Sequence, residues 1–209
     1  MKSNLKKVLF CVIALFGDLL TSFMAYRFKL PFFFDTEFAV AITFYMGLVP
    51  GLVVAACYNP LMIIWLCRYT GTPFSFYDCL YAICGMLIIF ATWVFSRNKK
   101  EFLYSKPLTL FYLVIIAGVS SVFSFIAASS LDTFILPLFK TTTGFSAFDN
   151  FAEVLREFEM GTFFSYLVPR IPLTVLDRFV CTFAGFGIYR LLVKYDEYQL
   201  QKEFCTADR

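Results

Sequence analysis

The composition of this 209-residue chain excludes a soluble globular domain. Hydrophobic residues make up 60% of it and charged residues only 16%, whereas a soluble domain has about 25% charged residues. The mean hydropathy is +0.74, and apolar residues come in runs of roughly 18 to 23, enough to cross a hydrocarbon core of ~30 Å. We therefore expect an all-α, polytopic integral membrane protein.

The residue types also exclude several functions. Histidine is absent, which removes the commonest general base and the commonest metal ligand. The seven cysteines form no CxxC pair, and most lie in apolar runs, where cysteine packs as a small hydrophobic residue. The net charge is only +3, without the basic, aromatic-interleaved patch that nucleic-acid binding requires. We predict no catalytic residue, metal or cofactor, and hence not an enzyme.

Hydropathy predicts a six-transmembrane-helix bundle in a single domain covering residues 1–209. The approximate spans are 8–26, 32–47, 52–67, 74–95, 108–131 and 171–193. The basic N-terminus and first apolar run are read as a retained helix, because no clear small-x-small cleavage site precedes the second span.

Glycine and proline mark the breaks between and within these spans. Gly47, Pro50 and Gly51 predict a tight turn between the second and third spans. Pro60 predicts a kink in the third span, because proline removes a backbone donor from the helix.

The longest predicted non-spanning part is an external loop over about residues 132–170. Within it, apolar residues recur every three or four positions over 147–158, which predicts an amphipathic helix. This helix lies either at the membrane interface or as a lid over a site, and the sequence favours neither. Residues 194–209 form a short polar C-terminal tail.

The basic residues predict the orientation in the membrane. With six spans, the side holding both termini receives 11 Lys and Arg residues and the other side receives 6. Basic loops face the cytoplasm. We therefore predict a multi-pass protein of the plasma membrane with both termini cytoplasmic.

The candidate site consists of polar residues that this topology gathers near the outer face. Buried polar groups in a bilayer are candidates for function, although a structural role is an alternative for each one. Phe33 and Phe34 are expected to pack on a flat ligand, and the polar residues to fix its edge. The polar residues are Asp35, Glu37, Asn59, Asp78, Arg170, Asp177 and Arg178.

Small residues form a stripe on the first span. Gly17, Thr21 and Ala25 recur every four residues, and such a stripe lets another helix approach closely. The stripe predicts either packing within the chain or a docking surface for a partner.

The motif Pro31-x-x-x-Asp35, followed by Gly47-x-x-x-Gly51 and Asn59, resembles the first half of the S components of energy-coupling-factor (ECF) vitamin transporters. It is also similar to related membrane input domains of bacterial sensor proteins. The stretch IPLTVLDRFVCTF in the last span resembles the same group, in which a charged pair often opens the last helix.

This resemblance implies high-affinity binding of a vitamin or similar small nutrient at the outer face of the membrane. External loops would close over the ligand. Import would then require a membrane coupling subunit and cytoplasmic ATPase subunits, docked on small residues of the first helix. Here the stripe at Gly17, Thr21 and Ala25 departs from the AxxxA pattern common in that family.

Other functions are kept as alternatives. One is a ligand-sensing membrane domain that acts through a signalling partner, and another is a stand-alone small-molecule transporter. The chain shows neither a fused output domain nor the inverted repeat of many secondary transporters, so we favour the substrate-capturing subunit.

Overall fold

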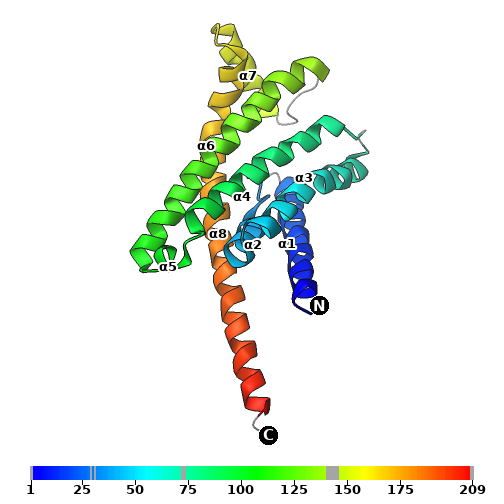
Figure 1. The fold of residues 1–209 in the computed structure, drawn as a ribbon. Coiled ribbons are helices and arrows are strands. Elements are labelled where there is room, and N and C mark those ends of the chain that lie inside the picture. Colours follow the sequence, from blue (N-terminus) through cyan, green and yellow to red (C-terminus); the bar gives the residue numbers. More distant parts are fainter. Residues whose placement is uncertain (1, 29, 31, 72–73, 140–145, 208–209) are drawn as a thin grey trace.

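The computed structural model describes residues 2–28, 30, 32–71, 74–139 and 146–207, with side chains for 5–28, 30, 32–71, 74–139 and 149–198. These residues are helical apart from their connections (Figure 1). The elements are α1 (Lys2–Arg27), α2 (Glu37–Met46), α3 (Leu48–Thr70), the 3₁₀ helix η1 (Phe76–Tyr81), α4 (Ala82–Ser96), α5 (Lys99–Phe102), α6 (Lys106–Phe139), α7 (Ser146–Glu157) and α8 (Thr162–Ala207).

In the part of the chain that the structure describes, five helical segments are long and apolar enough to cross a membrane. They are Leu5–Arg27, Leu48–Thr70, Phe76–Ser96, Lys106–Phe139 and Thr162–Tyr198. The predicted helix over 32–47 is reduced to α2, which has 10 residues and a length of ~15 Å. The six-span count is therefore not confirmed, because α2 by itself is too short to cross a core of ~30 Å.

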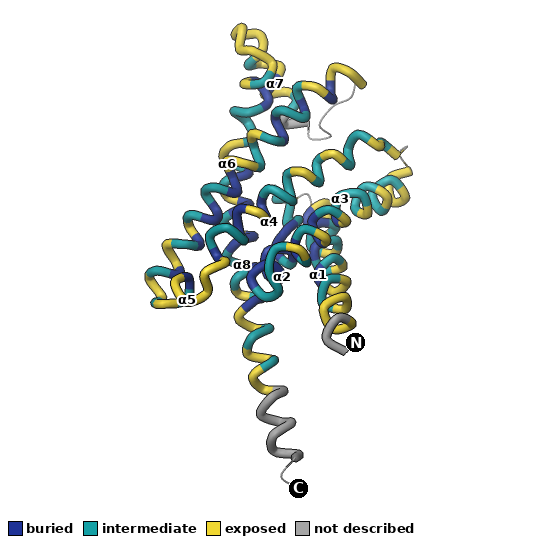
Figure 2. The backbone as a smooth tube through the Cα atoms, viewed as in Figure 1, coloured by how far each residue is buried: buried dark blue, intermediate teal, exposed yellow. Residues whose placement is uncertain are grey.

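The short helix α2 lies at the centre of the molecule. The long helices pack in the order α1, α3, α4, α6, α8, each against the next, and α2 packs against α1, α3, α4 and α8. Figure 2 shows that the buried residues concentrate where these helices meet around α2. Apolar residues on every side of α2 account for this burial, since an all-round apolar helix is stable only inside a protein or a membrane.

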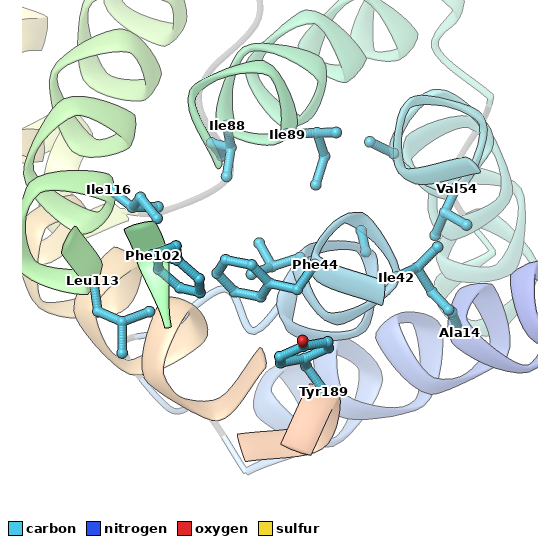
Figure 3. Packing of buried hydrophobic residues seen from close by; sticks show 13 residues of the cluster. Ala14, Ile42, Phe44, Val54, Ile88, Ile89, Phe102, Leu113, Ile116 and Tyr189 are labelled. Carbon is cyan, nitrogen blue, oxygen red and sulfur yellow. The ribbon is translucent and has the colours of Figure 1, made fainter. Parts of the chain in front are cut away.

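The C-terminal half of α2 lies in an apolar core. Phe44 is fully buried, and its ring stacks on Phe102 with centroids 5.5 Å apart. Ile89, Ile116 and Tyr189 belong to the same cluster (Figure 3).

Glycines let neighbouring helices approach α2 closely. A Cβ built on Gly51 would meet Thr43 Oγ1 at 2.0 Å, and one on Gly185 would meet the Glu37 carbonyl oxygen at 2.7 Å. The predicted tight turn between the second and third spans is made by Gly47, whose φ of 94° lies in the left-handed region that favours glycine. Gly51 is inside α3 and serves packing.

The predicted boundaries were wrong at both ends of the external loop. α6 continues to Phe139 and α8 begins at Thr162, so Asp132 and Arg170 lie inside helices. Pro169 and Pro172 lie inside α8, just before and just after the predicted start of the last span at about residue 171. Residues 140–145 of the loop lie outside the described residues.

The predicted amphipathic helix over 147–158 is α7, which packs against α8. Ala152 is buried in a small cluster with Leu136 and Tyr166, and the Arg156 guanidinium lies 4.7 Å from the Tyr166 ring centre. The cavity described below is lined by the link, α3, η1 and α4, so no residue of α7 is part of its wall.

Both ends of the described chain lie at the same end of the molecule (Figure 1). α8 is 46 residues long and extends beyond the other helices at that end. Figure 2 shows its projecting part largely exposed as far as its burial is described.

Candidate functional site

A non-helical link, residues 32–36, joins α1 to α2 inside the helix bundle. The hydroxyls of two α1 residues donate hydrogen bonds to its carbonyls. Ser22 Oγ lies 3.0 Å from the Phe33 oxygen and 2.6 Å from the Phe34 oxygen, and Thr21 Oγ1 lies 3.1 Å from the Phe34 oxygen. Such bonds are required, since a non-helical backbone at membrane depth must find its partners within the protein.

The amides of the same link bind a carboxylate of α8. Asp177 Oδ1 accepts the Phe33 N–H at 2.9 Å and the Phe34 N–H at 3.3 Å. Phe34 has a φ of 44°, which is unusual for a residue with a side chain. Successive amides with one residue in the left-handed region form a concave anion site, so Asp177 explains the strained conformation.

Arg178 of α8 also binds the link, through the side chains of Asp35 and Thr36. Its side chain is 2% exposed, and its Nη2 donates to Asp35 Oδ1 at 2.5 Å and to Asp177 Oδ2. Its Nη1 donates to Thr36 Oγ1 at 2.7 Å. Nε has no hydrogen-bond partner among the described residues. One guanidinium is thus shared by two carboxylates.

Charged side chains of other helices bind the two ends of α2, and their charges complement the helix dipole. Asp18 on α1 is fully buried, and its two oxygens accept the Phe38 and Ala39 N–H groups at 2.9 and 3.0 Å. At the other end, Lys99 Nζ donates to the Phe44 carbonyl, and burial lowers the pKa of its amine. A carboxylate at the N-terminus and a cation at the C-terminus both stabilise a helix.

A second buried polar cluster joins α6, α8 and η1. Asp132 is fully buried, and its Oδ2 accepts from Arg170 Nε at 2.8 Å and from Arg170 Nη2 at 2.5 Å. The Tyr81 hydroxyl donates to Asp132 Oδ1. No backbone amide or carbonyl takes part in these bonds.

A cavity of about 10 Å³ lies between the two clusters. That volume holds about one water molecule. Its lining residues come from the link, α3, η1 and α4, and they are Asp35, Thr36, Ala55, Tyr58, Asn59, Tyr81, Ala82 and Gly85. The cavity adjoins the first cluster through Asp35 and the second through Tyr81.

The donors at the cavity wall are largely bound to other protein groups. The Tyr58 hydroxyl donates to Ser22 Oγ at 2.6 Å, and Thr36 Oγ1 donates to Asp35 Oδ1 at 3.2 Å. Asn59 Nδ2 donates to the Asp78 carbonyl at 3.4 Å.

One group of candidate ligand atoms has metal-site spacing. A carboxylate oxygen of Asp35, one of Asp177 and the Cys181 sulfur lie within 4.8 Å of one another. The Arg178 guanidinium donates to both carboxylates, so these oxygens have hydrogen-bond partners without a metal ion.

The structure brings most of the predicted site residues into one region. Asp35 and Asn59 line the cavity, and Arg178 and Asp177 adjoin it through Asp35. Arg170 reaches it through Asp132 and Tyr81.

The remaining predicted residues lie beside the cavity. Asp78 contributes its carbonyl to Asn59. Glu37 is buried toward α8, with Oε2 at 3.7 Å from the Cys181 sulfur. Phe33 and Phe34 are half-buried, and the atoms that they contribute here are from the backbone.

The small-residue stripe of α1 packs within the chain. A Cβ on Gly17 would lie 2.8 Å from the Phe38 ring, Thr21 binds the link, and Ala25 is 2% exposed. Packing within the chain, one of the two expectations, is thus observed, and docking of a partner on this stripe stays a prediction.

Some residues of the two clusters and the cavity were not among the predicted site residues. They are Asp18, Ser22, Thr36, Tyr58, Tyr81 and Asp132. The carboxylates carried a usable signal, because a charge inside an apolar span is costly and points inward. The two tyrosines carried none, since the chain contains 12 tyrosines and 29 phenylalanines.

Comparison with family models, curated proteins and solved structures gave no match to this chain. Its function is therefore argued from the cavity and the two polar clusters.

Proposed function

We propose that this chain is a membrane protein that captures a small nutrient from the outer side for uptake, in the manner of an ECF S component. The observation that supports this most directly is the convergence of polar side chains from three segments, the link, α3 and η1, on one cavity. Asp35, Tyr58, Asn59 and Tyr81 line it, and apolar walls with a few convergent polar groups are typical of small-ligand sites.

The cavity as described is the closed form of this site. A vitamin-sized ligand needs roughly 300 Å³ or more, and the cavity holds about 10 Å³. η1 is the element that would move on opening, because few hydrogen bonds between it and neighbouring helices are found among the described residues: Asn59–Asp78, at 3.4 Å, and Tyr81–Asp132. The Tyr77 ring also stacks on Phe139 of α6.

The test is to purify the full chain in mild detergent and identify any co-purifying small molecule by native mass spectrometry. A vitamin-class molecule, released by the Asp35→Asn variant, is the expected result. Pull-down from membranes is expected to recover a coupling subunit and an ATPase. If no small molecule binds and no ATPase co-purifies, the proposal is wrong.

A signalling role is the second candidate, favoured by the continuity of α8. This one helix carries Arg170 and Arg178 beside the cavity and then extends past the bundle at the end holding the termini. Such a rod is suited to transmit ligand binding to a partner on that side. Recovery of a kinase or cyclase in the same pull-down, with no ATPase, would favour this function.

A further inference from the structure

We infer that the solute captured at this cavity carries a compact cationic group, an ammonium or similar hydrogen-bond donor, that binds between Asp35 and the rings of Tyr58 and Tyr81. This inference rests on the proposed function and specifies its ligand. It is drawn from the size, the hydrogen-bonding state and the charge of the cavity.

The size of the cavity matches such a head group. Its volume of about 10 Å³ suits one water-sized group, which is also the size of an ammonium. A planar carboxylate or a phosphate is larger. The rest of the solute would lie toward η1, outside the closed cavity.

The hydrogen bonds already made by the residues that line the cavity favour a ligand that donates hydrogen bonds. The hydroxyl protons of Thr36, Tyr58 and Tyr81 are all given to other protein groups. Their oxygens keep acceptor lone pairs, as does the carboxylate of Asp35. The Asn59 carbonyl oxygen adds an acceptor, and its amide is bound to the Asp78 carbonyl.

The charges near the cavity favour a cation. Asp35 lines it and its side chain is 28% exposed, in contact with the buried Arg178. Arg178 is shared with Asp177, and Arg170 is taken by Asp132. Three carboxylates, Asp35, Asp132 and Asp177, are thus bound by two guanidiniums among the described residues here, and a bound cation would balance the third.

The two tyrosine rings add to the same preference. An ammonium over an aromatic face is stabilised by the ring quadrupole, more strongly when the site is dry. Tyr58 is 8% exposed, and both tyrosines line the cavity. A carboxylate beside two tyrosines is thus a combination of groups that binds a cation.

The experiment uses three probes of similar size and different charge: ethanolamine, ethylene glycol and glycolate. The full chain is purified in detergent at neutral pH, and the thermal unfolding temperature is measured with each probe at matched ionic strength. Ethanolamine is expected to raise the unfolding temperature, and the other two are not. A ligand of the native state stabilises it in proportion to its binding.

Variants tie the effect to the cavity. Asp35→Asn is expected to abolish the ethanolamine shift and Asp35→Glu to restore part of it. Because Asp35→Asn also unpairs Arg178, Tyr81→Leu and Tyr81→Phe provide a second test that leaves that ion pair alone. The leucine variant is expected to lose the shift, and the phenylalanine variant, which keeps the ring, to retain most of it.

Equal shifts with all three probes, a shift with glycolate only, or no shift with ethanolamine would overturn the inference. The co-purified solute separates this failure from failure of the proposed function. A neutral or anionic solute at the cavity refutes the cation and leaves nutrient capture standing, whereas a chain that binds no solute at all refutes both.

Discussion

The two buried polar clusters differ in what their side chains hold. In the first, Asp18, Asp177 and the α1 hydroxyls bind backbone groups of residues 33–39. In the second, Tyr81, Asp132 and Arg170 bind one another. The first cluster supplies hydrogen bonds to backbone groups of the link and of the first turn of α2 that lack helical partners. The second cluster joins η1, α6 and α8 through their side chains.

This difference indicates which cluster is free to change during function. Backbone groups at membrane depth must stay satisfied, so the first cluster is expected to persist whether or not a ligand is bound. The described bonds of the second cluster exchange more easily, because they join side chains to one another and their breakage leaves no backbone group without its partner. Movement on binding is therefore expected at η1, α6 and Arg170.

The largest expected effect comes from Asp177→Leu. This variant leaves the Phe33 and Phe34 amides and part of Arg178 without their acceptor, and breaking a buried ion pair costs about 3–5 kcal/mol. We expect little folded protein after extraction in detergent, measured by size-exclusion chromatography and thermal unfolding.

The matched control is Asp132→Leu, which removes a fully buried carboxylate from the second cluster. This variant is expected to fold and to unfold at a temperature between those of Asp177→Leu and the wild type. If the two variants lose equal stability, the distinction between the clusters is wrong.

A smaller loss is expected for Gly185→Ala, which tests the packing of α8 on α2. The new Cβ would lie 2.7 Å from the Glu37 carbonyl oxygen, so α8 must move away from the start of α2. Overpacking of this kind costs about 1–3 kcal/mol. The thermal unfolding temperature should fall accordingly.

Gly187→Ala serves as the control on the same helix, because nothing lies within 4 Å of its added Cβ. Its unfolding temperature should equal or slightly exceed that of the wild type, since alanine restricts the unfolded chain. Equal destabilisation by both variants would argue against a close α2–α8 contact.

Asp18→Leu is expected to cost about 0.5–2 kcal/mol, the usual range for losing a helix cap. Its carboxylate binds the first N–H groups of α2, and Asp18→Asn should recover part of the loss because its oxygen still accepts. Hydrogen exchange of the Phe38 and Ala39 amides measures the effect directly. Unchanged exchange in Asp18→Leu would show that the cap does not stabilise α2.

The smallest effect on stability is expected for Asn59→Leu, which removes a half-buried amide from the cavity wall. Ligand affinity should fall while the unfolding temperature stays close to that of the wild type. Binding of the co-purified solute measures this, with the exposed Cys57→Leu as the control on the same helix. Unchanged affinity would remove Asn59 from the site.

Local sequence was sufficient for those parts of the fold that depend on the length and polarity of one segment. The long apolar helices, the amphipathic α7 and the turn at Gly47 are of this kind. Asp177 and Arg178, which were predicted as site residues, are buried in the protein, as expected for charged side chains in an apolar span.

Tertiary contacts decided how residues 32–47 fold and which side chains bind them. A helix was expected there because the segment is apolar, yet Asp177, 144 positions after Phe33, binds its amides, and Ser22 binds its carbonyls. These contacts satisfy the backbone of the non-helical link. They join residues too far apart in the sequence for a local pattern to reveal. The cavity wall of Tyr58 and Tyr81 was likewise set by packing of α3 against η1, since an aromatic side chain does not reveal from sequence which face it will line.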